Sequence, residues 1–184
     1  MNYCSSCGAV VSREIPQGDN RLRFVCAGCD EIHYHNPNIV VGCVPSWEGQ
    51  VLLCRRAIEP RVGFWTMPAG YLEIGESTEE GAARESEEEA GVVVEIGNLL
   101  SLVSIPQIGQ VHMIYLGKLN SAEFLAGEES LEVKFFSEND IPWDDLAFPT
   151  VKLTLEHFFA DRSRGEFTLH SEVLRRPETA NNKQ

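Results

Sequence analysis

Apolar residues recur in short runs along the middle of the chain, and polar turn residues separate these runs. Asn38 to Pro45 is a nearly continuous β-branched run, and the turn residues Glu48-Gly49 separate it from a second run, Gln50 to Arg55. Runs of this length predict buried strands, so these two should form a β-hairpin. Further strands are predicted at Val92 to Ile96, Leu99 to Ile105, Gly109 to Leu119 and Val133 to Phe136.

One helix has clear start and stop signals. Ser77 and Glu80 have the spacing of a capping box, which predicts a helix that begins near Thr78. Gly91 should end it, because glycine readily adopts the left-handed conformation that closes a helix. Together with the strands, this helix predicts an α/β domain.

The last third of the chain predicts a second helical region. Ser137 to Pro142 looks like its start, and Thr150 to Arg162 has the apolar spacing of an amphipathic helix. Beyond it, Phe167 to Leu174 predicts one short strand. We expect the polar tail that follows to be frayed.

Composition limits the classes of partner. The chain has 184 residues, of which 43% are hydrophobic, and its net charge is −13 with a pI near 4.8. Nucleic acids and anionic membranes both require a basic face, so we expect neither to be the main partner. No signal peptide or membrane-length apolar run is visible, which leads us to expect a cytoplasmic protein.

Four cysteines near the start predict a structural zinc site. Cys4-x-x-Cys7 and Cys26-x-x-Cys29 are separated by eighteen residues, a spacing that suits a tetrahedral Cys4 site in a short β-ribbon. Disulfide bonds or a redox site are the alternatives, and the lack of a secretory signal disfavours them. Four thiolates leave no position for water or substrate, so this zinc would be structural.

We therefore expect three parts in the chain. Residues 1–36 should form the zinc ribbon, whose small size makes the metal the main source of its folding energy. Residues 37–165 should form the main domain. Residues 166–184 should form a C-terminal extension that is partly flexible.

The stretch from Gly70 to Val92 carries the strongest chemical signal. It contains eight carboxylates and one basic residue, Arg84, a balance that self-repulsion makes costly unless a cation is present. On the predicted helix, Glu85, Glu88 and Glu89 fall at i, i+3 and i+4 and so share one side. Carboxylate oxygens are the ligands that Mg²⁺ and Mn²⁺ prefer, so we predict a divalent metal site here.

This stretch resembles the Nudix box, the signature of the Nudix hydrolases. Gly70 is followed after five residues by Glu76 and, after seven more, by Arg84-Glu85-Ser86-Glu87-Glu88-Glu89-Ala90-Gly91-Val92. Ser86 departs from the bulky aliphatic residue that the family prefers, which should loosen the packing under the helix without removing a ligand. The resemblance implies an α/β/α sandwich with a mixed β-sheet, preceded by the zinc ribbon, and hydrolysis of a nucleoside diphosphate linked to another moiety.

The resemblance also implies roles for the acidic residues and for Arg84. Glu88 and Glu89 are expected among the catalytic residues, and Arg84 is expected to support catalysis by ion pairing with neighbouring carboxylates. An acidic loop before the last predicted strand often supplies a general base in this family. Glu129 is our preferred candidate over Glu132, and a solvated acidic turn is the alternative. The expected metal ligands are Glu85, Glu88, Glu89 and the backbone carbonyl of Ala69.

Several further residues are candidates for binding substrate. A guanidinium at the end of the second predicted strand could clamp a phosphate, although charged strand ends also face solvent. The amides between the predicted strands that end at Ile105 and begin at Gly109 could bind a base or ribose, or belong to a plain connecting loop. Phe148 and Pro149 should edge the pocket. The substrate-binding candidates are Arg55, Arg56, Glu76, Tyr71 and Gln107.

The resemblance extends beyond the box and favours one branch of the family. The segments YHNPNIVVGCV, GFWTMPAGYLEIGES, IPQIGQ and LAFPTV are similar to zinc-ribbon Nudix hydrolases related to FAD and ADP-ribose pyrophosphatases. NADH pyrophosphatases carry an SQPWPFPxS array after the box, and no such run occurs between Val92 and Gln110. We therefore expect ADP-ribose or FAD as substrate and AMP as product, with NADH pyrophosphatase activity as the alternative.

A non-catalytic nucleotide sensor, or a binding protein that uses the zinc ribbon, is an alternative of another class. That hypothesis predicts loss of the metal carboxylates, yet all of them are present. The family also implies a homodimer and a small-molecule nucleotide as partner.

Overall fold

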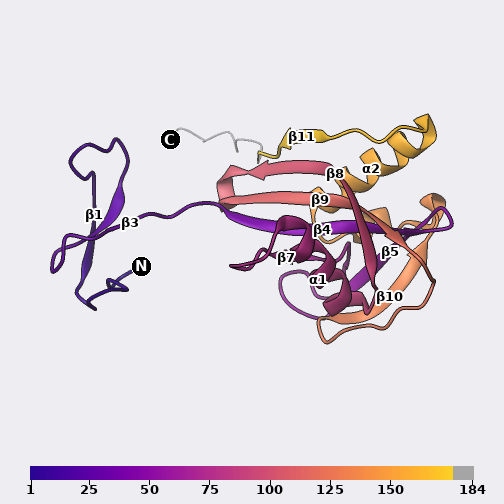
Figure 1. Ribbon diagram of the computed structural model, residues 1–184, viewed down its shortest axis with the longest axis horizontal. Coiled ribbons are helices and arrows are strands. Elements are labelled where there is room, and N and C mark those ends of the chain that lie inside the picture. Colours follow the sequence, from indigo (N-terminus) through magenta and orange to yellow (C-terminus); the bar gives the residue numbers. More distant parts are fainter. Residues whose placement is uncertain (176–184) are drawn as a thin grey trace, which may run out of the picture. The chain divides into compact units, whose positions relative to one another are not determined.

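The computed structural model describes residues 1–175, which belong to two compact units (Figure 1). The first unit is Met1–Pro37, and the second begins at Asn38. Residues 176–184, part of the expected C-terminal extension, lie outside the described residues.

The first unit is a small antiparallel sheet in the order β1-β2-β3. Cys4 and Cys26 are the only buried residues among its 37 residues. A unit with so little apolar burial cannot be stable through its core alone, as the sequence led us to expect. Its strands are β1 (Val11–Glu14), β2 (Arg23–Cys26) and β3 (Ile32–His33).

The second unit is built on a mixed sheet in the order β10-β5-β4-β9-β8-β11, with β6 paired to β5 and β7 paired to β4. The β4–β9 and β8–β11 pairs are parallel and the other pairs are antiparallel. The strands are β4 (Asn38–Trp47), β5 (Gln50–Arg56), β6 (Trp65–Thr66), β7 (Ala69–Tyr71), β8 (Val94–Ile105), β9 (Gln110–Leu119), β10 (Ser130–Phe136) and β11 (His170–Val173).

Two helices, α1 (Thr78–Ala90) and α2 (Pro149–Arg164), cover opposite faces of this sheet (Figure 1). Two successive residues of β9 belong to different hydrophobic clusters. Tyr115 packs in one cluster with Ala82 of α1, and Ile114 packs in the other with Leu155 of α2. Because side chains alternate along a strand, the two clusters lie on opposite faces. The expected α/β/α sandwich with a mixed sheet is confirmed. No helix in residues 1–175 is long and apolar enough to cross a membrane.

The local signals of the sequence fix the ends of α1. The backbone N–H of Glu80 donates to Ser77 Oγ at 3.2 Å, and the N–H of Ser77 donates to Glu80 Oε2 at 2.7 Å, so the capping box is complete. Gly91 closes the helix with a φ of 63°. The predicted hairpin between β4 and β5 is also present, because Trp47 pairs with Gln50.

Two predicted elements differ in detail. The two strands predicted over residues 92–105 form one strand, β8, with irregular pairing to β9 between Ile96 and Ser101. The predicted start of the second helical region forms only 3-10 turns, η2 (Glu138–Asp140) and η3 (Trp143–Asp145). Pro142 explains the interruption, since it has no N–H to donate and restricts the residue before it.

The serine inside α1 does not leave a gap. Ser86 is fully buried, and its hydroxyl donates to the carbonyl of Ala82 at 2.8 Å. Its Oγ also lies 3.2 Å from Cys43 Sγ on β4. A backbone hydrogen bond and close approach to the strand therefore replace the aliphatic packing, and the expected loosening is not seen.

The end of α2 is fastened to the sheet edge through Asp161. Its carboxylate is fully buried and accepts hydrogen bonds from the N–H of Thr168 at 2.8 Å and from Nε2 of His170 at 2.9 Å. Burial opposes the charged form, but these hydrogen bonds and the charge of Arg164 outweigh it and lower the pKa of Asp161. Because His170 begins β11, this carboxylate holds the segment after α2 against β8.

We predict that Asp161→Ala lowers the free energy of unfolding by about 3 kcal/mol at neutral pH, because it leaves buried donors without an acceptor. The pKa of Asp161 is lowered by folding, so its stabilising effect is present above its ordinary pKa of about 4 and is lost as the pH falls through the folded value. Denaturant unfolding at several pH values measures the difference, which should shrink in acid.

The exposed Asp144 provides the control for this prediction. Asp144→Ala should change the stability by less than about 0.5 kcal/mol. An Asp161→Ala effect no larger than that of the control would show that the buried carboxylate does not anchor this segment.

Candidate active site and zinc site

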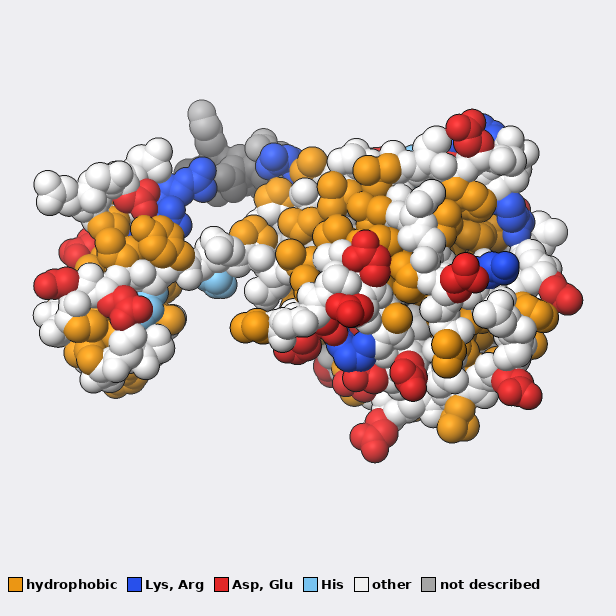
Figure 2. Space-filling view, viewed as in Figure 1, with side chains coloured by type: hydrophobic (Ala, Val, Ile, Leu, Met, Phe, Trp, Pro, Cys, Tyr) orange, Lys and Arg blue, Asp and Glu red, His pale blue; other side chains and the backbone are white. Residues whose placement is uncertain are grey.

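Helix α1 brings two carboxylates against the backbone of β7. Glu85 and Glu89 are one turn apart and are 9% and 6% exposed, whereas Glu88 is exposed. Gly70 provides the space, since a Cβ there would lie 2.3 Å from Glu85 Oε1. Acidic side chains also gather on the surface around α1 (Figure 2). The glycine of the motif is therefore required for a buried carboxylate to reach the strand backbone.

The electrostatics of this pair call for a cation. Burial, together with the charge of Glu85, raises the pKa of Glu89 to about 8, although Arg56 opposes the shift. Burial also raises the pKa of Glu85, against the effect of Arg84. Within residues 1–175 Glu89 has no ion-pair partner. Adjacent buried carboxylates with too little positive charge around them suit a hard divalent cation. Among the described residues, the ligand atoms of three or more side chains converge only at the four cysteines, so Glu88 does not close a three-carboxylate set with this pair.

Arg84 links three carboxylates on the outer side of α1. Its Nε and Nη2 donate to both oxygens of Glu76 at 3.0 and 2.9 Å, and its Nη1 donates to Glu85 at 2.7 Å and Glu88 at 2.9 Å. The hydrogen bonds from Arg84 hold the pKa of Glu76 at about 2. Both oxygens of Glu76 accept hydrogen bonds from Arg84, so Glu76 holds the guanidinium in position.

A loop between β9 and β10 caps the C-terminal end of α1. The N–H of Leu125 donates to the carbonyl of Ala90 at 2.9 Å, and the N–H of Gly127 donates to that of Glu89 at 3.1 Å. A Cβ on Gly127 would lie 1.8 Å from the carbonyl oxygen of Glu88, so only glycine allows this approach. The sequence analysis did not identify Gly127, because this contact depends on the tertiary fold.

The same loop separates the two acidic candidates for a general base. The charge of Glu129 contributes to the raised pKa of both Glu85 and Glu89, which places its carboxylate near theirs. Glu132 lies 3.8 Å from Arg55 instead. The structure therefore brings Glu129, and not Glu132, toward the buried pair.

A small cavity opens on the other side of Ala69, on the face of the sheet that α2 covers. Its volume is about 50 Å³, and it is partly open to solvent. Its lining includes Arg56, Met67, Ala69, His112, Phe148 and Val151. Ala69 thus lies beside both the carboxylates and the cavity.

Arg56 is the cation of this region. Its Nε donates to the carbonyl of Pro60 at 2.8 Å, and its guanidinium lies 5.2 Å from the ring centroid of Phe148. No carboxylate of residues 1–175 forms an ion pair with it, whereas Arg55 lies near Glu132. Arg56 therefore keeps a charge that an anionic ligand could use.

The remaining candidates are Tyr71 and Gln107. Gln107 is exposed in the 3-10 turn η1 (Pro106–Ile108) and does not line the cavity. Tyr71 is 51% exposed, and its hydroxyl accepts a hydrogen bond from Gln110. The sequence analysis missed His112, which lines the cavity. The available signal was that His112 is a polar residue between the alternating apolar residues of β9.

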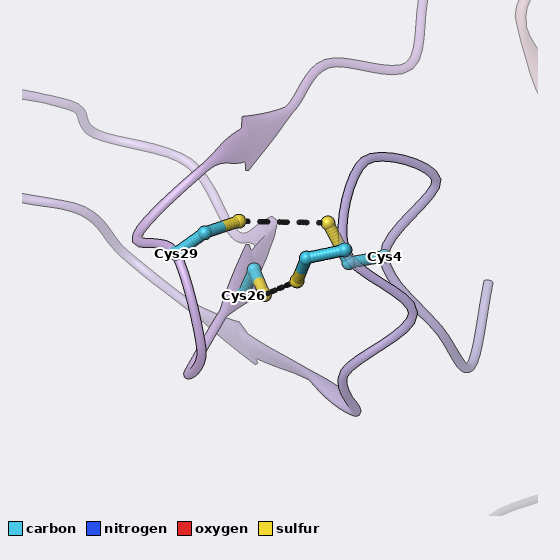
Figure 3. Close-up of side chains that lie close together, drawn as sticks. Cys4, Cys26 and Cys29 are labelled. Atoms are coloured by element: carbon cyan, nitrogen blue, oxygen red, sulfur yellow. Dashed lines mark hydrogen bonds between the residues drawn. The ribbon is translucent and has the colours of Figure 1, made fainter.

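The four cysteines of the first unit converge as a zinc site requires. Their sulfur atoms all lie within 4.8 Å of one another, with Cys4 and Cys29 at 3.7 Å and Cys7 and Cys26 at 3.4 Å (Figure 3). Tetrahedral zinc with Zn–S bonds of about 2.3 Å separates sulfurs by about 3.8 Å. These thiolates therefore fit one zinc ion.

Cys4 also has the hydrogen bonds of a metal thiolate. Burial opposes its charged form, but the backbone N–H groups of Cys7 and Ser6 and the ring of His33 outweigh burial and lower the pKa of Cys4 to about 6. Nε2 of His33 lies 3.3 Å from Cys4 Sγ. His33 contacts a ligand and does not replace one.

Comparison with protein families and solved structures matches both units. The family model described as Nudix N-terminal matches residues 2–35, and the NUDIX domain model matches residues 36–160. A crystal structure of a NUDIX hydrolase from Nitrosomonas europaea has a TM-score of 0.93 and 45% identity, covering 96% of this chain and 100% of that chain. An ADP-ribose pyrophosphatase from Streptococcus suis shares the fold, with a TM-score of 0.59 and 19% identity over 76% of this chain and 100% of that one.

Two curated relatives have named activities. The ADP-ribose pyrophosphatase of Methanocaldococcus jannaschii is 28% identical over 128 residues, which cover 67% of this chain and 75% of that protein. The NAD-capped RNA hydrolase NudC of Vibrio vulnificus is 28% identical over 147 residues, which cover 77% of this chain and 53% of NudC. The chain thus matches about half the length of this relative.

We predict that the purified protein contains one zinc ion per chain and that Cys26→Ser abolishes zinc binding, because three thiolates cannot complete the tetrahedral site. Elemental analysis measures the metal, and hydrogen exchange should show loss of protection in β1 to β3. The tryptophans, Trp47, Trp65 and Trp143, all lie in the second unit, so its unfolding can be followed separately by fluorescence.

Cys43→Ala provides the control for the zinc prediction, since Cys43 is buried in β4 of the second unit. This variant should retain its zinc. Full zinc content in Cys26→Ser would contradict the assignment of the four ligands.

Proposed function

Because the chain belongs to the NUDIX hydrolase family, whose domain model spans residues 36–160, we propose that it hydrolyses the pyrophosphate of ADP-ribose or FAD and releases AMP, using Mg²⁺ or Mn²⁺. The observation that carries this proposal is the pair of buried carboxylates, Glu85 and Glu89, against Ala69 and Gly70. The similarity to a protein named ADP-ribose pyrophosphatase supports the choice of substrate.

The buried pair gives the site its affinity for cations. Glu85, Glu88, Glu89 and the carbonyl of Ala69 would hold the divalent ions, which neutralise the pyrophosphate and activate water when bound. Arg84 keeps Glu85 and Glu88 oriented, and its two hydrogen bonds to Glu76 hold it in place when those carboxylates turn toward a metal.

The region beside Ala69 supports binding of the nucleotide. Arg56 has no ion-pair partner within residues 1–175, in a chain whose net charge is −13, so it suits a phosphate group of the substrate. Phe148 and His112 line the cavity beside it and suit the edge of the base. The phosphates would then lie between this cavity and Glu89.

Glu129 is the proposed general base. Water attacks in line the phosphorus that is not part of AMP, a P–O bond forms, and the bond from that phosphorus to the bridging oxygen breaks. AMP leaves with the bridging oxygen, and the other fragment, ribose 5-phosphate or FMN, keeps the oxygen of the water. The proton of the water passes to the carboxylate of Glu129. Its nearness to Glu85 and Glu89 supports this role, as does the pairing of Glu132 with Arg55.

A second candidate function is cleavage of NADH or of NAD-capped RNA. The similarity to NudC favours it, and a capped RNA would make nucleic acid a partner despite the acidic composition. A nucleotide sensor without catalysis is a weaker candidate, because the chain keeps every carboxylate of the motif. We also propose a cytoplasmic homodimer, which light scattering of the purified protein and localisation of the tagged chain would test.

The direct test of the function is release of AMP from ADP-ribose, FAD and NADH, each with Mg²⁺ and with Mn²⁺. Preferred cleavage of ADP-ribose or FAD would support the first proposal, and preferred cleavage of NADH would support the second. If no compound is cleaved with either metal while the nucleotides still bind, the sensor function replaces both.

We predict that Glu89→Gln lowers kcat by more than about 100-fold, because even residues that only support metal ligands are worth about 10- to 100-fold. The same change should raise the melting temperature of the metal-free protein, since burial already disfavours the charged form and raises the pKa of Glu89. Glu87→Gln, at an exposed position of α1, should alter neither quantity. Full activity in Glu89→Gln would contradict the metal site.

We predict that Gly127→Ala lowers kcat by roughly 10- to 100-fold, because the added Cβ would push the loop away from α1 and displace Glu129. Steady-state kinetics measures the effect, and an unchanged fluorescence unfolding curve would show that the fold survives. Ala126→Ser, at an exposed position of the same loop, should behave as wild type. Equal rates for all three proteins would show that the position of this loop does not matter for the reaction.

A further inference from the structure

Three polar side chains form a hydrogen-bonded chain from β7 to the cavity. Nε2 of Gln110 donates to the hydroxyl of Tyr71 at 2.9 Å, and Oε1 of Gln110 lies 3.0 Å from Nε2 of His112. His112 lines the cavity beside Arg56 and Phe148. The chain therefore connects the exposed surface next to the acidic motif with the proposed base site.

The amide of Gln110 determines which nitrogen of His112 carries the proton. Its NH₂ group is directed to Tyr71, so its carbonyl oxygen faces the histidine and can only accept a hydrogen bond. In this orientation of the amide, Nε2 of His112 is the protonated nitrogen, and Nδ1 has a free lone pair. Burial lowers the pKa of His112, which favours this neutral ring.

Nδ1 is available to a ligand. It has no hydrogen-bond partner in the part of the chain that the structure describes. In the same part of the chain, the fully buried side-chain atoms without a hydrogen-bond partner are Ser101 Oγ, Ser130 Oγ and Thr154 Oγ1. Nδ1 of His112 is not one of them, so it is not fully buried. Nδ1 is therefore an accessible acceptor on a ring that lines the cavity.

We propose that His112 determines base specificity: its Nδ1 accepts a hydrogen bond from the 6-amino group of adenine and so selects 6-amino over 6-oxo purines. This inference rests on the proposed function, which supplies an adenine nucleotide as substrate. His112 lines the cavity together with Arg56 and Phe148, so a base edge that enters there would meet its ring.

Hypoxanthine provides the sharpest contrast with adenine. Its 6-oxo group is an acceptor, so it would place oxygen lone pairs against the Nδ1 lone pair and leave both unpaired. A site that hydrogen-bonds a substrate group rejects an analogue without that group strongly, and one such mismatch corresponds to roughly 10- to 100-fold. The base edge is remote from the reacting phosphorus, so the difference should appear mainly in KM.

The test compares ADP-ribose with its hypoxanthine counterpart, IDP-ribose, in four proteins. The wild type should prefer ADP-ribose by roughly 10- to 100-fold in kcat/KM. His112→Phe and Gln110→Leu should bring this ratio toward 1, the first by removing the acceptor and the second by releasing the histidine to either tautomer. His35→Phe, at an exposed position of the first unit, should keep the wild-type ratio.

An NMR measurement tests the same inference without catalysis. Long-range ¹H–¹⁵N spectra distinguish the protonated ring nitrogen, and the signals absent from His112→Phe identify His112 among the five histidines. The proposal requires the neutral form with the proton on Nε2. If His112→Phe fails to fold, His112→Gln identifies the same signals. A proton on Nδ1 would overturn the proposal.

The outcomes separate the two proposals. If ADP-ribose and IDP-ribose are cleaved equally well, or if the ratio is the same in His112→Phe, the role of His112 is refuted and the proposed function stands. If neither is cleaved, the proposed function fails, and the relative affinities for AMP and IMP, measured by calorimetry, decide the role of His112 by the same ratios.

Discussion

Burial of Glu85 and Glu89 against the backbone of β7 is the constraint on which the rest of the second unit depends. Charge is costly at such a position, and the raised pKa of both carboxyl groups expresses that cost. The arrangement requires a glycine at position 70, because any side chain there would overlap the Glu85 carboxylate. It becomes favourable when a divalent cation is bound, so the same feature that destabilises the metal-free protein gives the site its function.

The elements around this pair are arranged to hold it. Arg84 reaches Glu85 and Glu88 from one side while its other hydrogen bonds tie it to Glu76. From the other end of α1, the loop through Gly127 covers the last carbonyls of the helix and carries the acidic residues that follow it. The nucleotide would approach from the cavity face, where Arg56 offers the opposite charge. Arg84, the loop through Gly127 and Arg56 therefore come from three segments that are far apart in the sequence.

The sequence was sufficient wherever a structural signal is local. The capping box before α1, the glycine that ends it and the carboxylates spaced along it all depend on residues within one helix, and the structure has the caps as predicted. Contacts between distant segments could not be predicted in this way. In the sequence Gly127 is an ordinary loop glycine, and its role follows only from the packing of α1 beside it. His112 lies in a strand whose alternating apolar residues indicated only one face of that strand. Pro142 carried a usable signal for the 3-10 turns before α2, which the prediction did not use.

The most direct test of this account is the melting temperature of the second unit, followed by tryptophan fluorescence, as Mn²⁺ is added to protein freed of catalytic metal. A cation that binds only the folded state stabilises it by an amount that grows with the logarithm of its concentration. The account predicts that the wild type gains stability in this way and that Glu89→Gln starts higher and gains much less. A wild-type melting temperature that stays constant up to about 10 mM Mn²⁺, where even a weak site would be filled, would contradict it.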